Sequence, residues 1–253
     1  MRLLPLRSAW PCGVLALALA ACVVPMRSGS PIPEASRQLV VVVTPSWEAT
    51  TGTLRRFART GPDAPWHPVG EPVEVVVGRS GLGWGRGLHG APPSEGPQKA
   101  EGDGRATAGV FLLTTAFGYA ATDSANTGLP YLQATPDLEC VDDAASRYYN
   151  QVLDRTSVAA DWSSHEEMRR GDVLYRRGVV VAHNAEAAPG GGSCIFLHVW
   201  RGPGSTTSGC TAMPEPSLAE VIAWLDHDAA PVLVQLPSSV YRRLRNAWGL
   251  PAL

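Results

Sequence analysis

The stretch that decides both the fold and the chemistry is IFLHVWRGPGSTTSGC, residues 195–210. Its apolar start predicts a strand that ends at His198, and residues 201–207 favour turns that fold the chain back on itself. Cysteine is a strong nucleophile as a thiolate, and a neighbouring imidazole can accept its proton. The segment therefore predicts an acyl-transfer site with Cys210 as nucleophile and His198 as general base. The alternative is a buried packing cysteine and a surface histidine.

Outside this stretch, short β-branched runs alternate with glycine and proline. They predict further strands at 39–43, 73–77, 179–181 and 232–236. Helices are fewer: a capping box at Ser217–Glu220 opens one, and residues 142–153, a segment starting at Ser163 and the amphipathic 241–248 are three others. The expected fold is mainly β with a few peripheral helices.

The N-terminus resembles a bacterial lipoprotein signal. Residues 1–21 combine basic residues with a short apolar run, and they end in Leu-Ala-Ala before Cys22, which would be acylated. The alternative is an ordinary cleaved signal with Cys22 incidental. We expect residues 22–38 to form a tether, 39–237 the catalytic domain and 238–253 a C-terminal tail. The residues after Cys22 include no acidic one nearby, which by resemblance to Gram-negative lipoproteins predicts a periplasmic protein anchored to the outer membrane.

Charge and composition limit the partners. The chain has 21 basic and 23 acidic residues, and removal of Arg2 and Arg7 with the signal would leave 19 against 23, a formal charge of −4. A negative balance argues against nucleic acid as a partner. No Cys/His spacing resembles a zinc site, so we expect no metal and no cofactor.

Three cysteines remain once Cys12 is assigned to the signal and Cys22 to lipidation. An exported protein can keep disulfides. A Cys140–Cys194 bridge would leave Cys210 as a free thiol. A Cys194–Cys210 bridge would instead leave Cys140 as the free thiol, so the count alone does not decide between them.

Three blocks of sequence together resemble the L,D-transpeptidases of the YkuD (ErfK/YbiS) type. They are His198 with Ser208-Gly209-Cys210, residues 77–79 with 99–111, and residues 139–150. The resemblance implies the β-rich YkuD-like catalytic domain, a Cys210 thioester formed with peptidoglycan stem peptides, and His198 as general base and acid. Because it reserves Cys210 for catalysis, it also pairs Cys140 with Cys194. Two residues differ from the family: Ser208 stands where a histidine is usual, and Ala212 where an arginine or asparagine is usual.

Other residues are assigned to the surroundings of the nucleophile. Ser208, Gly209 and Thr211 are expected to form the oxyanion and substrate loop, since backbone N–H groups there could stabilise a tetrahedral oxyanion. A backbone carbonyl is the expected partner that orients His198. Candidate cleft residues are His183, Asn184 and Trp84, the first two also explained as structural.

Three functions follow from these expectations. The first is an L,D-transpeptidase. The second is a carboxypeptidase or amidase of the same chemistry, in which water replaces the acceptor amine. The third is a cell-wall-binding lipoprotein whose catalytic loop has degenerated, as the residues at 208 and 212 would allow.

Overall fold

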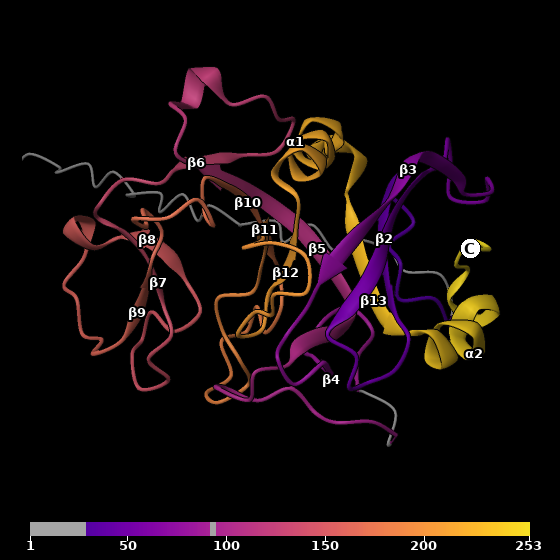
Figure 1. The fold of residues 1–253 in the computed structure, drawn as a ribbon, viewed down its shortest axis with the longest axis horizontal. Helices are drawn as coiled ribbons and strands as arrows, with labels where there is room; N and C mark the ends of the chain where they lie inside the picture. The colour runs from indigo at the N-terminus through magenta and orange to yellow at the C-terminus, as the bar shows by residue number, and fades with distance from the viewer. Residues whose placement is uncertain (1–28, 92–94) are drawn as a thin grey trace, which may run out of the picture.

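The computed structural model describes residues 29–91 and 95–253, and the fold is mainly β (Figure 1). The predicted signal peptide, Cys12 and Cys22 lie outside the described residues. The strands are β1 Gln38–Thr44, β2 Thr51–Ala58, β3 His67–Val76, β4 Leu82–Trp84, β5 Ala106–Gly118, β6 Tyr131–Gln133, β7 Leu138–Val141, β8 Val152–Asp154, β9 His165–Glu167, β10 Arg177–Val181, β11 Phe196–Val199, β12 Thr211–Met213 and β13 Val232–Pro237. The helices are α1 Glu215–Trp224 and α2 Ser238–Trp248, with short 3-10 turns at Thr122–Ser124, Arg155–Ser157 and His227–Ala229. Among the described helices, none is long and apolar enough to cross a membrane.

The main sheet closes on itself like a barrel. Its strands follow the order β10-β11-β12-β3-β2-β1-β13-β5, and β10 pairs with both β11 and β5. The first and last strands, β1 and β13, lie side by side and parallel, with Leu39 opposite Val232. The predicted strands at 39–43, 179–181, 195–197 and 232–236 are therefore confirmed, and the strand predicted at 73–77 is the end of a longer one.

The continuous apolar run of β1 is explained by burial on both faces. Val40 and Val42 face one hydrophobic core, which α1 covers, whereas Leu39 and Val41 face a second core, which α2 covers. Figure 1 shows α2 beside β13, at the opposite side of the molecule from β7. The predicted tail 238–253 is thus an integral part of the fold, since Val240, Tyr241 and Trp248 are buried in the second core.

A smaller sheet, β8-β7-β9, lies beside the main sheet (Figure 1). A third apolar cluster joins the two, and it contains Phe117, Phe196 and all three cysteines of the described chain. Cys140 on β7 forms a disulfide with Cys194, just before β11, with 5.9 Å between their Cα atoms. The predicted pairing is confirmed, and Cys210 is the free cysteine of this part of the chain.

Two predicted helices are wrong. In residues 142–153 the chain makes turns instead, because the Asp143 carboxylate accepts backbone N–H groups from Ala145 (2.9 Å) and Ser163 (2.8 Å). Such side-chain bonds compete with helical ones. The segment expected to start a helix at Ser163 becomes β9, paired with β7.

Two predicted boundaries also change. Helix α1 begins at Glu215, with Pro216 in its first turn, where a missing N–H needs no partner. Ser217 therefore lies inside the helix and does not cap it. The described part of the predicted tether packs on the fold: Ile32 and Ser36 are buried, and Arg37 donates its N–H to the Ala229 carbonyl.

We expect the disulfide to be a major source of stability. It closes a loop with a sequence separation of 54, and a loop of that size is worth about 4 kcal/mol. The double variant Cys140→Ser/Cys194→Ser should therefore lose about 2–5 kcal/mol of unfolding free energy in urea denaturation. Running both proteins on a Cys210→Ala background prevents thiol exchange, and equal midpoints for the two would contradict this expectation.

Candidate active site at Cys210

Strands β11 and β12 bring the predicted nucleophile and base to one place. They pair in parallel, with His198 opposite Ala212, and Cys210 immediately precedes β12. The Phe196 backbone N–H donates to Cys210 Sγ at 3.3 Å, a contact that favours the thiolate. Cys210 and His198 both line one cavity, each being about 6% exposed. The structure therefore brings the two predicted residues to the same cavity.

The tautomer of His198 leaves it ready to act as a base. Its Nδ1 lies 2.7 Å from the Val199 carbonyl, and because a carbonyl only accepts, Nδ1 carries the proton. Nε2 then has a free lone pair. The orienting group is a backbone carbonyl, as predicted. The Tyr175 ring packs edge-on against the imidazole, with 5.3 Å between ring centroids, and restricts its rotation.

Burial keeps both members of the pair neutral at rest. It lowers the pKa of His198 to about 4, while burial and then the nearby Glu166 carboxylate raise the pKa of the Cys210 thiol. In the structure the thiol S–H donates to the Cys194 carbonyl, 3.5 Å away. The resting pair is therefore a thiol and a neutral imidazole, not a thiolate and an imidazolium.

These pKa shifts predict the pH dependence of activity. His198 must be neutral to accept a proton, and its lowered pKa keeps it neutral down to about pH 4. The acid limb of kcat/KM should therefore lie near pH 4, well below the ordinary histidine value of about 6.5. A pH profile of kcat/KM tests this directly; a limb at 6.5 would contradict a buried, neutral base.

The loop before Cys210 offers two backbone donors for an oxyanion. The N–H of Gly209 is occupied by Thr207 Oγ1 at 3.2 Å, but within the described chain those of Ser208 and Cys210 have no partner. Thr207 Oγ1 also donates to the Cys210 carbonyl at 2.6 Å, which fixes the loop. Ser208 and Gly209 line a cavity at the nucleophile. The loop thus has the donors that a tetrahedral intermediate needs.

Thr211 does not belong to this loop. Its side chain is 2% exposed and donates to Gln235 Oε1 at 2.7 Å, and Gln235 in turn donates to the Thr107 carbonyl. This buried polar chain joins β12 to β13 and β5. The assignment of Thr211 to substrate contact was wrong, and its role is to hold β12 in place.

Two cavities meet at Cys210. Cavity A, about 290 Å³, is lined by Arg79, Lys99, Glu101, Gly102, Asp142, Glu166, Ser193, Cys194, Ile195, Ser208, Gly209 and Cys210. Cavity B, about 360 Å³, is lined by Arg79, Glu166, Arg170, Leu174, Tyr175, His198, Trp200, Arg201, Ser205, Thr206, Thr207, Ser208, Cys210 and Ala212. Four residues line both: Arg79, Glu166, Ser208 and Cys210. The nucleophile is therefore reachable from two sides.

Sequence reasoning missed most of the charged residues in these cavities. Arg79 was part of a motif block, but nothing in the sequence indicated that the segment after β3 would bring it to a cavity with Cys210. Glu166 reaches the site because its segment is a strand, and its carboxylate accepts a hydrogen bond from the Tyr175 hydroxyl. Burial raises the pKa of Glu166.

Four residues without a glycine's freedom hold a strained backbone, and one of them, Cys194, lines cavity A with Cys210. Asn150 (φ 62°), Asn184 (52°), Ala187 (52°) and Cys194 (54°) all adopt the left-handed conformation, which is unfavourable without glycine. Asn150 joins Cys194 to Asn184, since its Oδ1 accepts the Cys194 N–H at 3.0 Å and its Nδ2 donates to the carbonyls of His183 and Asn184. This arrangement holds the Cys194 carbonyl against the Cys210 thiol.

The three candidate cleft residues lie away from Cys210. His183 is 2% exposed and lines neither cavity A nor cavity B; its Nε2 donates to the Gly191 carbonyl at 2.9 Å. Trp84 and Asn184 line a separate cavity described below. His183 is therefore structural, the alternative explanation that its sequence position left open.

Comparisons with known proteins found no matching family model, no matching curated protein and no matching solved structure.

Proposed function

We propose that this protein is a cysteine acyltransferase that acts on peptidoglycan stem peptides as an L,D-transpeptidase, with Cys210 as nucleophile and His198 as general base and acid. The observation that supports it most is the position of Cys210 where cavities A and B meet. A transferase needs room for an acyl donor and for an acceptor. The identity of the substrate is supported by the sequence resemblance alone.

The proposed reaction has the following steps. His198 Nε2 takes the thiol proton while Sγ attacks the carbonyl carbon of the donor, and the N–H groups of Ser208 and Cys210 stabilise the oxyanion. The C–N bond then breaks, and His198 returns the proton to the leaving amine, which gives a thioester. An acceptor amine attacks the thioester and loses a proton to His198. The C–S bond then breaks, the product leaves with its new amide bond, and His198 returns the proton to the Cys210 thiolate.

Neither departure from the family pattern removes a group on which this chemistry depends. Ser208 replaces a histidine side chain but keeps its backbone donor. Ala212 is fully buried beside His198, between β11 and β3, so a larger side chain there would need space that the structure does not provide. Arg79 lines both cavities and brings a guanidinium to the site by another route.

The proposed enzyme works in the periplasm, held at the outer membrane by a lipid on Cys22. The Cys140–Cys194 disulfide supports an oxidising compartment, because such bridges are rare in the bacterial cytosol.

The test is incubation of the protein with purified muropeptides that carry tetrapeptide stems, with products identified by mass. Cross-linked products absent from a Cys210→Ala control would support transpeptidation. Shortened stems alone would assign the hydrolase. Binding without turnover, unchanged by Cys210→Ala, would assign the cell-wall-binding protein and refute the proposal.

A further inference from the structure

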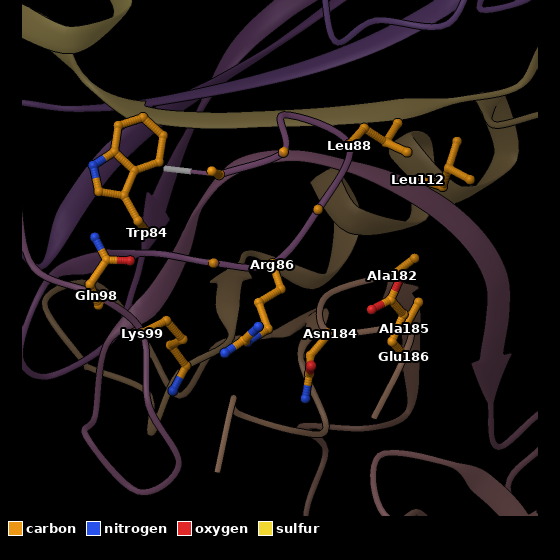
Figure 2. Close-up of a pocket in the computed structure, with 14 residues that line it drawn as sticks. Trp84, Arg86, Leu88, Gln98, Lys99, Leu112, Ala182, Asn184, Ala185 and Glu186 are labelled. Carbon is orange, nitrogen blue, oxygen red and sulfur yellow. The ribbon is translucent and has the colours of Figure 1, made fainter. Parts of the chain in front are cut away.

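A third cavity, about 740 Å³, lies outside the Cys210 site between residues 84–91 and 182–186 (Figure 2). We call it the Arg86 cavity. Lys99 lines it as well as cavity A, whereas neither Cys210 nor His198 does. Its volume falls in the range of small-molecule binding sites.

Apolar and polar side chains both line the Arg86 cavity. In Figure 2, Leu88, Leu112 and Ala182 lie on one side, and Gln98 and Lys99 lie on the other. The Arg86 side chain extends between them. A ligand that fits this lining has an aliphatic part and a polar part.

Arg86 provides an unneutralised positive charge. The Lys99 ammonium is held by the Asp103 carboxylate at 2.6 Å, and its side chain is 3% exposed. The Arg86 guanidinium, by contrast, forms neither a hydrogen bond nor a salt bridge with any described residue. Guanidinium groups favour carboxylates, which they bind through two parallel hydrogen bonds.

The backbone of Arg86 is fixed in advance. Its N–H donates to His183 Nδ1 at 3.2 Å, and its carbonyl accepts the Asn184 N–H at 2.8 Å. The flanking glycines are pressed on β5: a Cβ at Gly85 would lie 1.8 Å from Thr107 Oγ1, and one at Gly87 would lie 2.3 Å from the Val110 carbonyl. The loop backbone therefore needs little ordering on binding, and only the exposed Arg86 side chain has to be fixed.

We propose that the Arg86 cavity is a binding site for a monocarboxylate with a short aliphatic group, such as the C-terminal residue of a peptide. The carboxylate pairs with Arg86, and the aliphatic group lies on Leu88 and Leu112. Glu186, exposed on the apolar side of the cavity, repels ligands with a second negative charge. The inference does not depend on chemistry at Cys210.

The test compares acetyl-leucine with acetyl-leucinamide, which lacks the charge, by NMR titration of the full-length protein. We expect the acid to bind with a Kd on the order of 1 mM and to shift the amide signals of residues 85–88. Acetyl-leucinamide should bind the wild-type protein at least about 10-fold more weakly than acetyl-leucine does. Acetyl-leucine should bind the Arg86→Gln variant more weakly by the same factor. Arg242→Gln removes an exposed arginine on α2 that has no hydrogen bond or salt bridge in the described part, and it should change nothing.

Equal binding of acid and amide, an undiminished affinity in Arg86→Gln, or no saturable shift up to about 20 mM acid would each overturn the inference. Repeating the titration on Cys210→Ala separates it from the proposed enzyme. If Cys210→Ala still binds acetyl-leucine and the wild-type protein shows no turnover, the Arg86 site is supported and the proposed transferase activity is refuted.

Discussion

Replacing Cys210 with alanine should abolish acyl transfer, by roughly 10⁴-fold or more, because no other described thiol can form the thioester. The loss should fall on kcat and not on folding. The substitution leaves the Phe196 N–H without its sulfur partner, which costs only about 1 kcal/mol of unfolding free energy.

The measurement is transfer rate alongside a urea unfolding curve for wild type, Cys210→Ala and Cys210→Ser. The serine variant keeps an acceptor for Phe196 but has a far weaker nucleophile, so it should fold like wild type and still be inactive. A Cys210→Ala protein with more than about a tenth of wild-type activity would rule out this nucleophile.

Replacing His198 with glutamine should lower the acylation rate by about 10²–10⁴-fold, the usual contribution of a positioned general base. The thiol would then have to lose its proton without a base, although burial raises its pKa. Glutamine can still donate to the Val199 carbonyl, so the strand should keep its structure.

Single-turnover acylation measures this step apart from product release. The acid limb near pH 4 should disappear in His198→Gln, a change that a structural defect alone would not produce. The control is His67→Gln, an exposed histidine at the start of β3, which should leave both rate and profile unchanged. A rate within about 3-fold of wild type in His198→Gln would remove His198 from the mechanism.

The strands were predictable because their signal is local. The short, β-branched runs 39–43 and 232–236 favour strands buried on both faces, and the structure places them side by side. That Cys210 and His198 line one cavity was predictable for the same reason, since one strand and one turn deliver both side chains.

The predictions of helices at 142–153 and after Ser163 were wrong because side-chain hydrogen bonds determine the backbone conformation of that region. Asp143 binds backbone N–H groups from both segments, a contact between residues 20 positions apart that no local pattern reveals. The disulfide and the Asn150 hydrogen bonds then fix turns where the helix propensity of alanine and leucine would favour a helix.

Cavity residues were the least predictable. Arg79 follows β3 of the main sheet, Glu166 lies on β9 of the smaller sheet and Tyr175 precedes β10, and only the packing of the two sheets brings them to one cavity with Cys210. For Thr211 the prediction relied too much on sequence neighbours. The residue is adjacent to Cys210 in the sequence, but strand alternation turns its side chain into the core.

The most direct test of the central claim is the acyl-enzyme itself. Wild-type protein mixed with a tetrapeptide-stem donor and quenched in acid should gain the mass of the donor acyl group, less the leaving amine. Peptide mapping should place that mass on Cys210, and neutral hydroxylamine should release it as a thioester. Turnover with no adduct, or an adduct on any other residue, would contradict the account.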